Sequence, residues 1–225
     1  MSADPIPLRP RRRGNLADAV ADHIREGILN GTMKPGTRVD QDAIAEELGV
    51  SRLPVREALI TLDQEGLIEN IPRRGAYVQR LEREDIIDHY QLFGQVAGLS
   101  AARAVARLDD DGLARLVAIY EAIGSTEDRA EQERLNFEFH RTINKACGSK
   151  RIDSMLRLLT RSLPMPYFEF VPEWLDEAQR QHKEIVDAFQ RRDPMAAQRA
   201  MELHLNASAR HAVDVLEHMN FFEEQ

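Results

Sequence analysis

Apolar residues recur at intervals of three to four positions over most of the chain, which predicts a mainly helical protein. The first such stretch covers residues 16–29, where Leu16, Val20, Ile24 and Ile28 follow one another at four-residue spacing. Side chains four residues apart stand on one face of a helix. The sequence therefore predicts an amphipathic first helix with these four residues facing inward.

Two further helices and a hairpin are predicted after a break rich in glycine and proline. The helices are expected at residues 40–49 and 52–66, joined by a Gly-Val-Ser turn, with Ser51 placed to cap the second of them. Residues 67–70 and 76–81 are typical of short strands that meet at an Ile-Pro-Arg-Arg-Gly turn. Three helices followed by such a hairpin indicate a winged helix-turn-helix.

The strand pattern ends after Leu81, and the remainder is expected to be an all-helical bundle. Asp193 followed by Pro194 is typical of a helix start, and residues 163–174 form the one long irregular stretch, expected to be a loop. About six helices are predicted, at residues 84–108, 112–124, 127–147, 150–163, 173–192 and 194–222. The predicted organisation is a basic, disordered arm at 1–14, a winged helix at 15–80, and a helical domain at 81–225.

The net charge of the chain is less informative than the distribution of charge between the two predicted domains. The net charge is −8, but residues 1–80 hold 12 basic and 12 acidic side chains, whereas residues 81–225 hold 18 and 26. The predicted winged helix is thus free of the acidic excess that would oppose DNA. A single cysteine, Cys147, and the absence of a long apolar run or a secretion signal lead us to expect a cytoplasmic protein without a membrane partner.

The third predicted helix carries the chemistry expected of a DNA-recognition helix. Ser51, Arg52 and Arg56 offer donors from its first turns, and Leu59 and Leu62 lie on the opposite face. An ordinary surface helix with two arginines is the alternative, but the preceding turn and the following wing weaken that alternative.

The predicted wing adds a second group of donors. Arg73, Arg74 and Gly75 lie at the hairpin tip, where they could enter a neighbouring minor groove.

Residues 16–78 closely resemble the N-terminal domain of the GntR family of bacterial transcription regulators. The helical second domain resembles the FCD domain of the FadR subgroup. The first resemblance implies DNA-contacting roles for Arg38, Ser51, Arg52, Arg56, Arg73 and Gly75.

Three of the seven histidines are candidate metal ligands. His140 follows Asn136 by one helical turn, and His182 and His204 lie on two later predicted helices. Spacing alone favours ordinary helical histidines, because His204, His211 and His218 recur every seven residues and could form one polar face.

The resemblance to FCD domains reverses that preference. Metal-binding FCD domains carry an acid four residues before a histidine, followed by two later histidines, and Phe139-His140, His182 and His204 match that arrangement. Asn136 stands where the acid would be, so it would bring an amide oxygen without charge. The resemblance thus implies a divalent metal, Zn²⁺, Ni²⁺ or Mn²⁺, held by Asn136, His140, His182 and His204, with weaker affinity than the acidic version.

The effector is expected to be a small molecule, with a carboxylate as one candidate. FCD domains commonly place an arginine and a glutamate on their first helix, and several members bind a carboxylate ligand with that arginine. Phe93 and Ala97 occupy those positions here, so Arg161 or the metal would have to substitute, and Phe93 is expected to pack in the core.

The preferred hypothesis is a homodimeric, ligand-responsive repressor that binds pseudo-palindromic, double-stranded operator DNA. A metal-dependent enzyme built on the histidines is the alternative, but the sequence lacks an HExxH helix, a nucleophile elbow and a clear general base. A structural DNA-binding protein is a third possibility, which the large second domain argues against.

Overall fold

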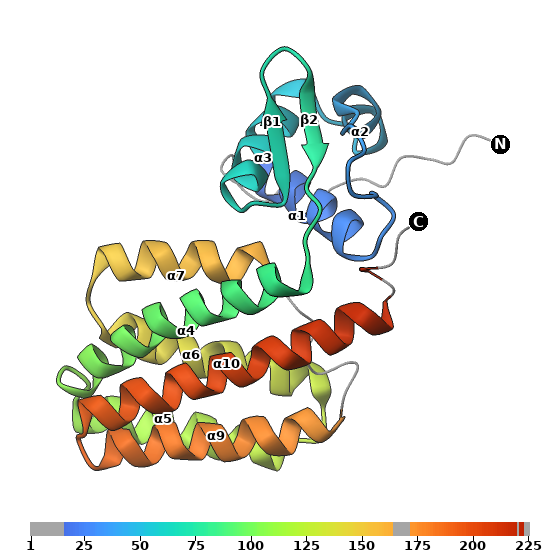
Figure 1. The fold of residues 1–225 in the computed structure, drawn as a ribbon. Coiled ribbons are helices and arrows are strands. Elements are labelled where there is room, and N and C mark those ends of the chain that lie inside the picture. The colour runs from blue at the N-terminus through green and yellow to red at the C-terminus, as the bar shows by residue number, and fades with distance from the viewer. Residues whose placement is uncertain (1–15, 164–171, 220, 223–225) are drawn as a thin grey trace. The chain divides into compact units, whose positions relative to one another are not determined.

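The computed structural model describes residues 16–163, 172–219 and 221–222 (Figure 1). The chain divides into two compact units, one running to Glu82 and including the end of the chain from Leu216, the other comprising Arg83–Val215. The sequence-based boundary assigned the end of the chain to the second unit instead. The arm predicted at residues 1–14 and most of the predicted loop at 163–174 lie outside the described residues.

The first unit is a winged helix-turn-helix, as the sequence predicts. Its helices are α1 (Leu16–Leu29), α2 (Gln41–Glu47) and α3 (Arg52–Gln64), and its wing is the antiparallel pair β1 (Ile68–Ile71) and β2 (Gly75–Val78). The register pairs Ile68 with Val78 and Ile71 with Gly75. The wing therefore turns through only three residues, 72–74.

Apolar side chains from the three helices form the interior of this unit. Val20 and Ile24 of α1 and Leu62 of α3 are fully buried, and Ile44 of α2 is nearly so. Leu16 is 38% exposed, so the prediction that it faces inward with the others was wrong.

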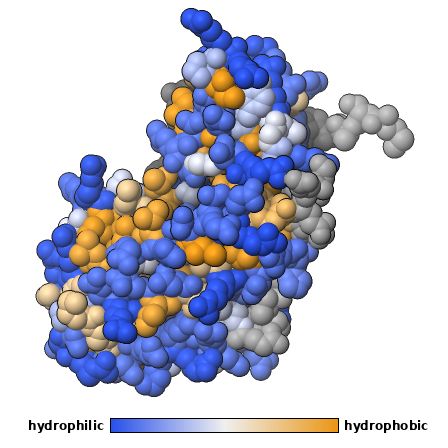
Figure 2. All heavy atoms as spheres, in the orientation of Figure 1, coloured by the Kyte–Doolittle hydropathy of each residue, from blue (hydrophilic) through white to orange (hydrophobic). Residues whose placement is uncertain are grey.

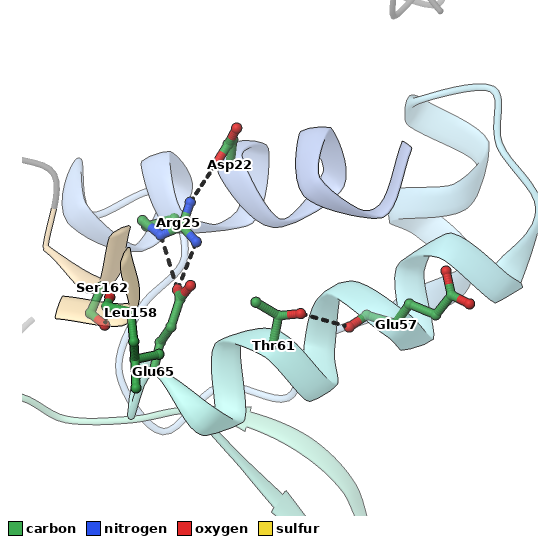
Figure 3. Close-up of polar contacts among 7 residues, drawn as sticks. All are labelled: Asp22, Arg25, Glu57, Thr61, Glu65, Leu158 and Ser162. Carbon is green, nitrogen blue, oxygen red and sulfur yellow. Dashed lines mark hydrogen bonds and ion pairs between the residues drawn. The ribbon is translucent and has the colours of Figure 1, made fainter. Parts of the chain in front are cut away.

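A long-range ion pair ties α1 to the end of α3. Arg25 donates from Nη2 to Glu65 Oε2 at 2.6 Å and from Nη1 to Asp22 at 2.5 Å (Figure 3). One turn earlier in α3, the Thr61 hydroxyl donates to the backbone carbonyl of Glu57 (Figure 3). Arg25 Nε also donates to Glu65 Oε2, and these two hydrogen bonds to one oxygen orient the end of α3 against α1.

The second unit is an all-helical bundle. Asp193 caps its last helix by accepting hydrogen bonds from the backbone N–H groups of Met195 and Ala196, which confirms the predicted start at Pro194. The loop predicted to reach residue 174 instead gives way to a helix at Pro172. The described helices are α4 (Arg83–Val105), α5 (Asp110–Ser125), α6 (Arg129–Ala146), α7 (Lys150–Ser162), α9 (Pro172–Gln190) and α10 (Pro194–His218) (Figure 1).

Helices far apart in the sequence share the core of the bundle. Phe139 and Ile143 of α6 pack with Ile185 and Phe189 of α9 and Leu116 of α5, all at 0% exposure. Replacing a residue of this kind by alanine typically costs about 2–5 kcal/mol. This packing holds α6, α9 and α10 in the positions from which their polar residues meet.

Candidate functional site: DNA-binding surface and histidine cluster

Helix α3 separates a polar face from an apolar face, as expected of a recognition helix. Arg52 and Arg56 are exposed, whereas Leu59 and Leu62 are 2% and 0% exposed. Each guanidinium can bind two acceptors of a base edge or phosphate at once. The helix thus presents its arginines to solvent while its leucines fix it to the unit.

Arg52 is held by an acidic partner on the neighbouring helix. Its Nε forms an ion pair with Asp42 of α2, and both side chains are more than 60% exposed. Exposed pairs of this kind contribute at most about 1 kcal/mol, so phosphate oxygens or a guanine edge can displace Asp42. The ion pair thus orients the Arg52 side chain and still allows it to bind DNA in place of Asp42.

Ser51 occupies the N-cap position of α3 but does not cap it. Its backbone is extended, at φ −76° and ψ 166°, and its side chain accepts no capping hydrogen bond. The capping role predicted for Ser51 was therefore wrong. The exposed hydroxyl stays free for an acceptor or donor on DNA, which is the role implied by the family resemblance.

The wing brings three of the predicted DNA-contacting residues together. Gly75 has φ +107°, and a Cβ at this position would lie 2.9 Å from Arg38 Nε. Arg38 forms an isolated bridge with Tyr77 of β2, so it lies beside the wing although it precedes α2. Arg73 adopts φ +65° at the turn. The structure thus places Arg38 and the hairpin tip at one surface.

Gly75→Ala is expected to destabilise the first unit and to weaken DNA binding. A left-handed backbone at a residue with a Cβ costs about 1–3 kcal/mol, and the added methyl group would displace the Arg38 guanidinium. Urea unfolding and operator affinity measure the two effects. Gly31→Ala is the control, because Gly31 also has positive φ but its Cβ would meet nothing within 4 Å. Equal losses of operator affinity in both variants would contradict a role for the Arg38 contact.

Three helices of the second unit bring one histidine each to a common point. His140 comes from α6, His182 from α9 and His204 from α10, and one ring nitrogen of each lies within 4.8 Å of the others. Two nitrogens bound to one tetrahedral Zn²⁺ at about 2.1 Å lie about 3.4 Å apart. The imidazoles would therefore have to close by up to about 1.4 Å around an ion, and three neutral nitrogens converging from three helices are a donor set that fits a metal.

The hydrogen bonding of the cluster also fits a metal. Among the described residues, neither ring nitrogen of the buried His182 has a hydrogen-bond partner. His204 Nδ1 donates to Gln181 Oε1 at 2.8 Å, since an amide oxygen can only accept. This bond orients the ring and leaves His204 Nε2 with its lone pair, the arrangement typical of metal-binding histidines.

Burial keeps the three imidazoles neutral. It lowers the pKa of His140 to about 4. Burial, and after it the neighbouring imidazoles, hold the pKa values of His182 and His204 well below the ordinary value. Neutral imidazole is the form that binds a cation, so these rings need not lose protons at neutral pH.

Asn136 lies near the cluster, on the same face of α6 as His140. Both residues are half-buried and line one cavity.

The alternative that His204, His211 and His218 form one polar face was wrong for the first two, which are 4% and 5% exposed. His211 stacks on Trp174 with ring centroids 4.9 Å apart, so it is a packed residue outside the cluster.

The cavity beside His140 and His204 has a volume of about 100 Å³ and an uncharged lining. Aromatic rings of Tyr90, Phe93 and Trp174 contribute to its walls, and no lysine, arginine, aspartate or glutamate is among the described residues that line it. Phe93 and Ala97, which replace the usual arginine and glutamate, both border it. Arg161 is exposed and lies outside the cavity.

Two residues of this site were missed by sequence reasoning. Gln181 directly precedes His182 yet points to His204, and Trp174 stacks near His204 at a centroid distance of 6.4 Å. The Gln-His pair was a usable signal for Gln181, because amides often orient metal-binding imidazoles. Trp174 carried no signal of its own.

Comparison with known families decides between the regulator and the enzyme. Residues 16–78 match the model of the bacterial regulatory proteins of the gntR family, and residues 88–207 match the FCD domain. The chain belongs to the GntR family of transcription regulators, with a C-terminal FCD domain. GntR regulators bind DNA, and the proteins related to this chain are regulators rather than enzymes.

Comparison with individual proteins agrees with this assignment. An uncharacterized HTH-type transcriptional regulator of Mycobacterium tuberculosis is 33% identical over 184 residues, covering 81% of this chain and 75% of that protein. The HTH-type transcriptional repressor RspR of Escherichia coli is 26% identical over 189 residues, covering 81% and 82%. McbR/YncC of E. coli shares the fold, with a TM-score of 0.63 at 21% identity over 92% of this chain and 99% of that one.

No helix in the described part of this GntR-family chain is long and apolar enough to cross a membrane. The cytoplasmic location expected from the sequence stays a prediction.

Proposed function

We propose that this GntR-family protein is a homodimeric repressor of the FadR subgroup that senses a small molecule in a metal-containing pocket of its FCD domain. The observation that carries the proposal is the convergence of His140, His182 and His204 beside a cavity, in a chain whose other unit is a DNA-binding domain. A sensor needs both a ligand site and a DNA-binding surface, and this chain has a candidate for each.

The metal would be held by the three imidazoles, with Asn136 supplying an amide oxygen. A divalent ion there would attract an electron-rich atom of the effector. Gln181 keeps His204 oriented for that role, and Trp174 and Phe93 enclose the ligand with apolar surface. The donor set is neutral, which suits Zn²⁺ or Ni²⁺ better than Mn²⁺, since imidazole is a borderline ligand and Mn²⁺ prefers oxygen.

A homodimer is proposed because two-fold proteins bind two-fold operators. Exposed apolar residues on the FCD domain are consistent with it. Leu92 and Leu99 on α4 are 61% and 42% exposed and stand two helical turns apart, and Met155 on α7 is 49% exposed. Figure 2 shows apolar side chains gathered among hydrophilic ones where α4 runs. Light scattering of the purified chain measures the oligomeric state.

Asn136→Asp is expected to tighten metal binding. The substitution adds a negative charge at the half-buried end of the cluster while keeping the side-chain shape, and charged oxygen ligands stabilise a divalent cation more than amide oxygens do. Competition with a fluorescent chelator measures the affinity. Asn144→Asp is the control, because Asn144 lines the same cavity but is already hydrogen-bonded to Ser100. Unchanged or weaker affinity in Asn136→Asp would exclude Asn136 as a ligand.

A footprint on DNA upstream of the protein's own coding region tests the regulator proposal, with and without chelator. Protection of a short, two-fold symmetric site is the expected result. Turnover of a substrate without any site-specific DNA binding would instead support a metal-dependent enzyme at the histidine cluster.

A further inference from the structure

A basic groove lies on the outer side of the histidine cluster, between α6 and α7. It is open, has a volume of about 770 Å³, and is distinct from the uncharged cavity. Five cationic side chains define it: Arg141 and Lys145 of α6, and Lys150, Arg157 and Arg161 of α7. Among the described residues that line it, Asp153 is the one acidic side chain, and it forms an ion pair with Arg157.

This clustering of positive charge runs against the composition of the domain. Residues 81–225 contain 18 Lys and Arg and 26 Asp and Glu. The described residues that line the groove include five of these basic side chains and one acidic side chain. Like charges held together repel, so such a cluster is stabilised when an anion neutralises it. Among the described residues, Arg141, Lys145 and Lys150 have no ion-pair partner.

The backbone of the groove adds to its preference for anions. Gly148, Ser149 and Lys150 line it, and Ser149 is the N-cap of α7. The N-terminus of a 13-residue helix carries a partial positive charge, although the Ser149 hydroxyl already accepts from the N–H of Ile152. Combined with guanidinium and ammonium groups, this is the chemistry that binds phosphate oxygens.

The groove adjoins the cavity beside the histidines. Phe137, His140, Asn144 and Thr160 line both, which places the two within reach of one molecule. The cavity is small and uncharged, and the groove is larger and positive. A ligand that fills both would therefore have a neutral end beside His140 and a multiply charged anionic end along α6 and α7.

We propose that the basic groove binds the phosphate of an organic phosphate effector whose uncharged end enters the cavity at the histidine cluster. The inference rests on the proposed sensing function and narrows its effector to a phosphorylated metabolite rather than a simple carboxylate. Arg161, the residue predicted from the sequence to replace the missing arginine, would then contact the phosphate end in the groove and not the end in the cavity.

Calorimetric titration of the native 225-residue chain with inorganic pyrophosphate tests the groove. The native chain is expected to bind it, and Arg141→Gln/Lys145→Gln to bind it about tenfold more weakly or worse, because two cationic donors to the phosphate oxygens are lost. Arg141→Lys/Lys145→Arg should retain most of the affinity. The control is Arg115→Gln/Arg180→Gln, which removes the same charge from exposed positions outside the groove and should bind as the native chain does.

Chelator-treated and dialysed native protein should still bind pyrophosphate, which separates the groove from the metal. Loss of binding on metal removal, or equal affinity in the groove and control variants, would overturn the proposal. So would a fall in operator affinity or in dimer mass on Arg141→Gln/Lys145→Gln without pyrophosphate, since the groove would then bind DNA or a second copy. Failure of the footprint to show site-specific binding would overturn the sensing function alone and leave the pyrophosphate result standing.

Discussion

His182→Ala is expected to abolish binding of the divalent metal proposed for the native chain, from about one ion per chain to none. His182 is 1% exposed, and neither of its ring nitrogens has a partner among the described residues, so a metal is the natural partner for one of them. Three protein nitrogens are the usual minimum for an open zinc site, and removing one leaves two. Elemental analysis after dialysis measures the content.

The same substitution should remove stabilisation by metal. A ligand present at 100 times its dissociation constant stabilises the folded state by about 2.7 kcal/mol, so added metal should raise the melting temperature of the native chain and not of the variant. His140→Ala is a second variant at a half-buried position, in case His182→Ala folds poorly. His211→Ala is the control, because His211 is buried on α10 but packs on Trp174 outside the cluster. Equal metal content in the His182→Ala and His211→Ala variants would exclude a metal site at the histidine cluster.

Arg52→Ala/Arg56→Ala is expected to lower operator affinity by about 2–6 kcal/mol, at about 1–3 kcal/mol for each arginine that contacts a base. Both side chains project from the exposed face of α3, and the buried Leu59 and Leu62 keep the helix in place without them. Fluorescence anisotropy with a labelled operator measures the affinity.

The control for this prediction is Arg115→Ala/Arg180→Ala, which makes the same change in charge within the FCD domain. If the arginines of α3 contact bases, their loss should also reduce the preference for operator over unrelated DNA. An equal effect of the two double variants on operator affinity would mean that net charge, and not α3, determines binding.

The sequence predicted the elements that depend on local periodicity and on capping. Helix α1 has the predicted bounds, and Asp193 and Pro194 start α10 as expected. The details that depend on tertiary contacts were missed: Leu16 is exposed at a helix end, and Ser51 does not cap α3. Periodicity reports which face is apolar, but it does not report whether another element covers a given turn.

The meeting of three histidines in the candidate site could be predicted from the sequence, whereas their surroundings could not; that the histidines bind a metal stays a prediction. The family resemblance pointed to His140, His182 and His204, and the fold brings them within 4.8 Å. Their spacing in the sequence could not show this, because convergence depends on how three helices pack. The Gln181 contact, the uncharged cavity and the basic groove likewise join residues from different helices.

Coupling between the pocket and the operator requires that the ligand bind the two conformations of the protein with different affinity. A coupling of about 1–3 kcal/mol changes operator affinity by about 5- to 150-fold. His140 is well placed to contribute, because it lines both the cavity and the groove and comes from a helix whose Phe139 is buried in the core. A shift of His140 on ligand binding would therefore move packed core residues.

We propose that the histidine cluster controls DNA binding. The decisive experiment measures the operator affinity of the native chain and of His182→Ala while divalent metal is withdrawn by a chelator and then restored. We expect a reversible change of at least about fivefold in the native chain and none in the variant. Operator affinity that stays the same in both chains throughout the titration would contradict it.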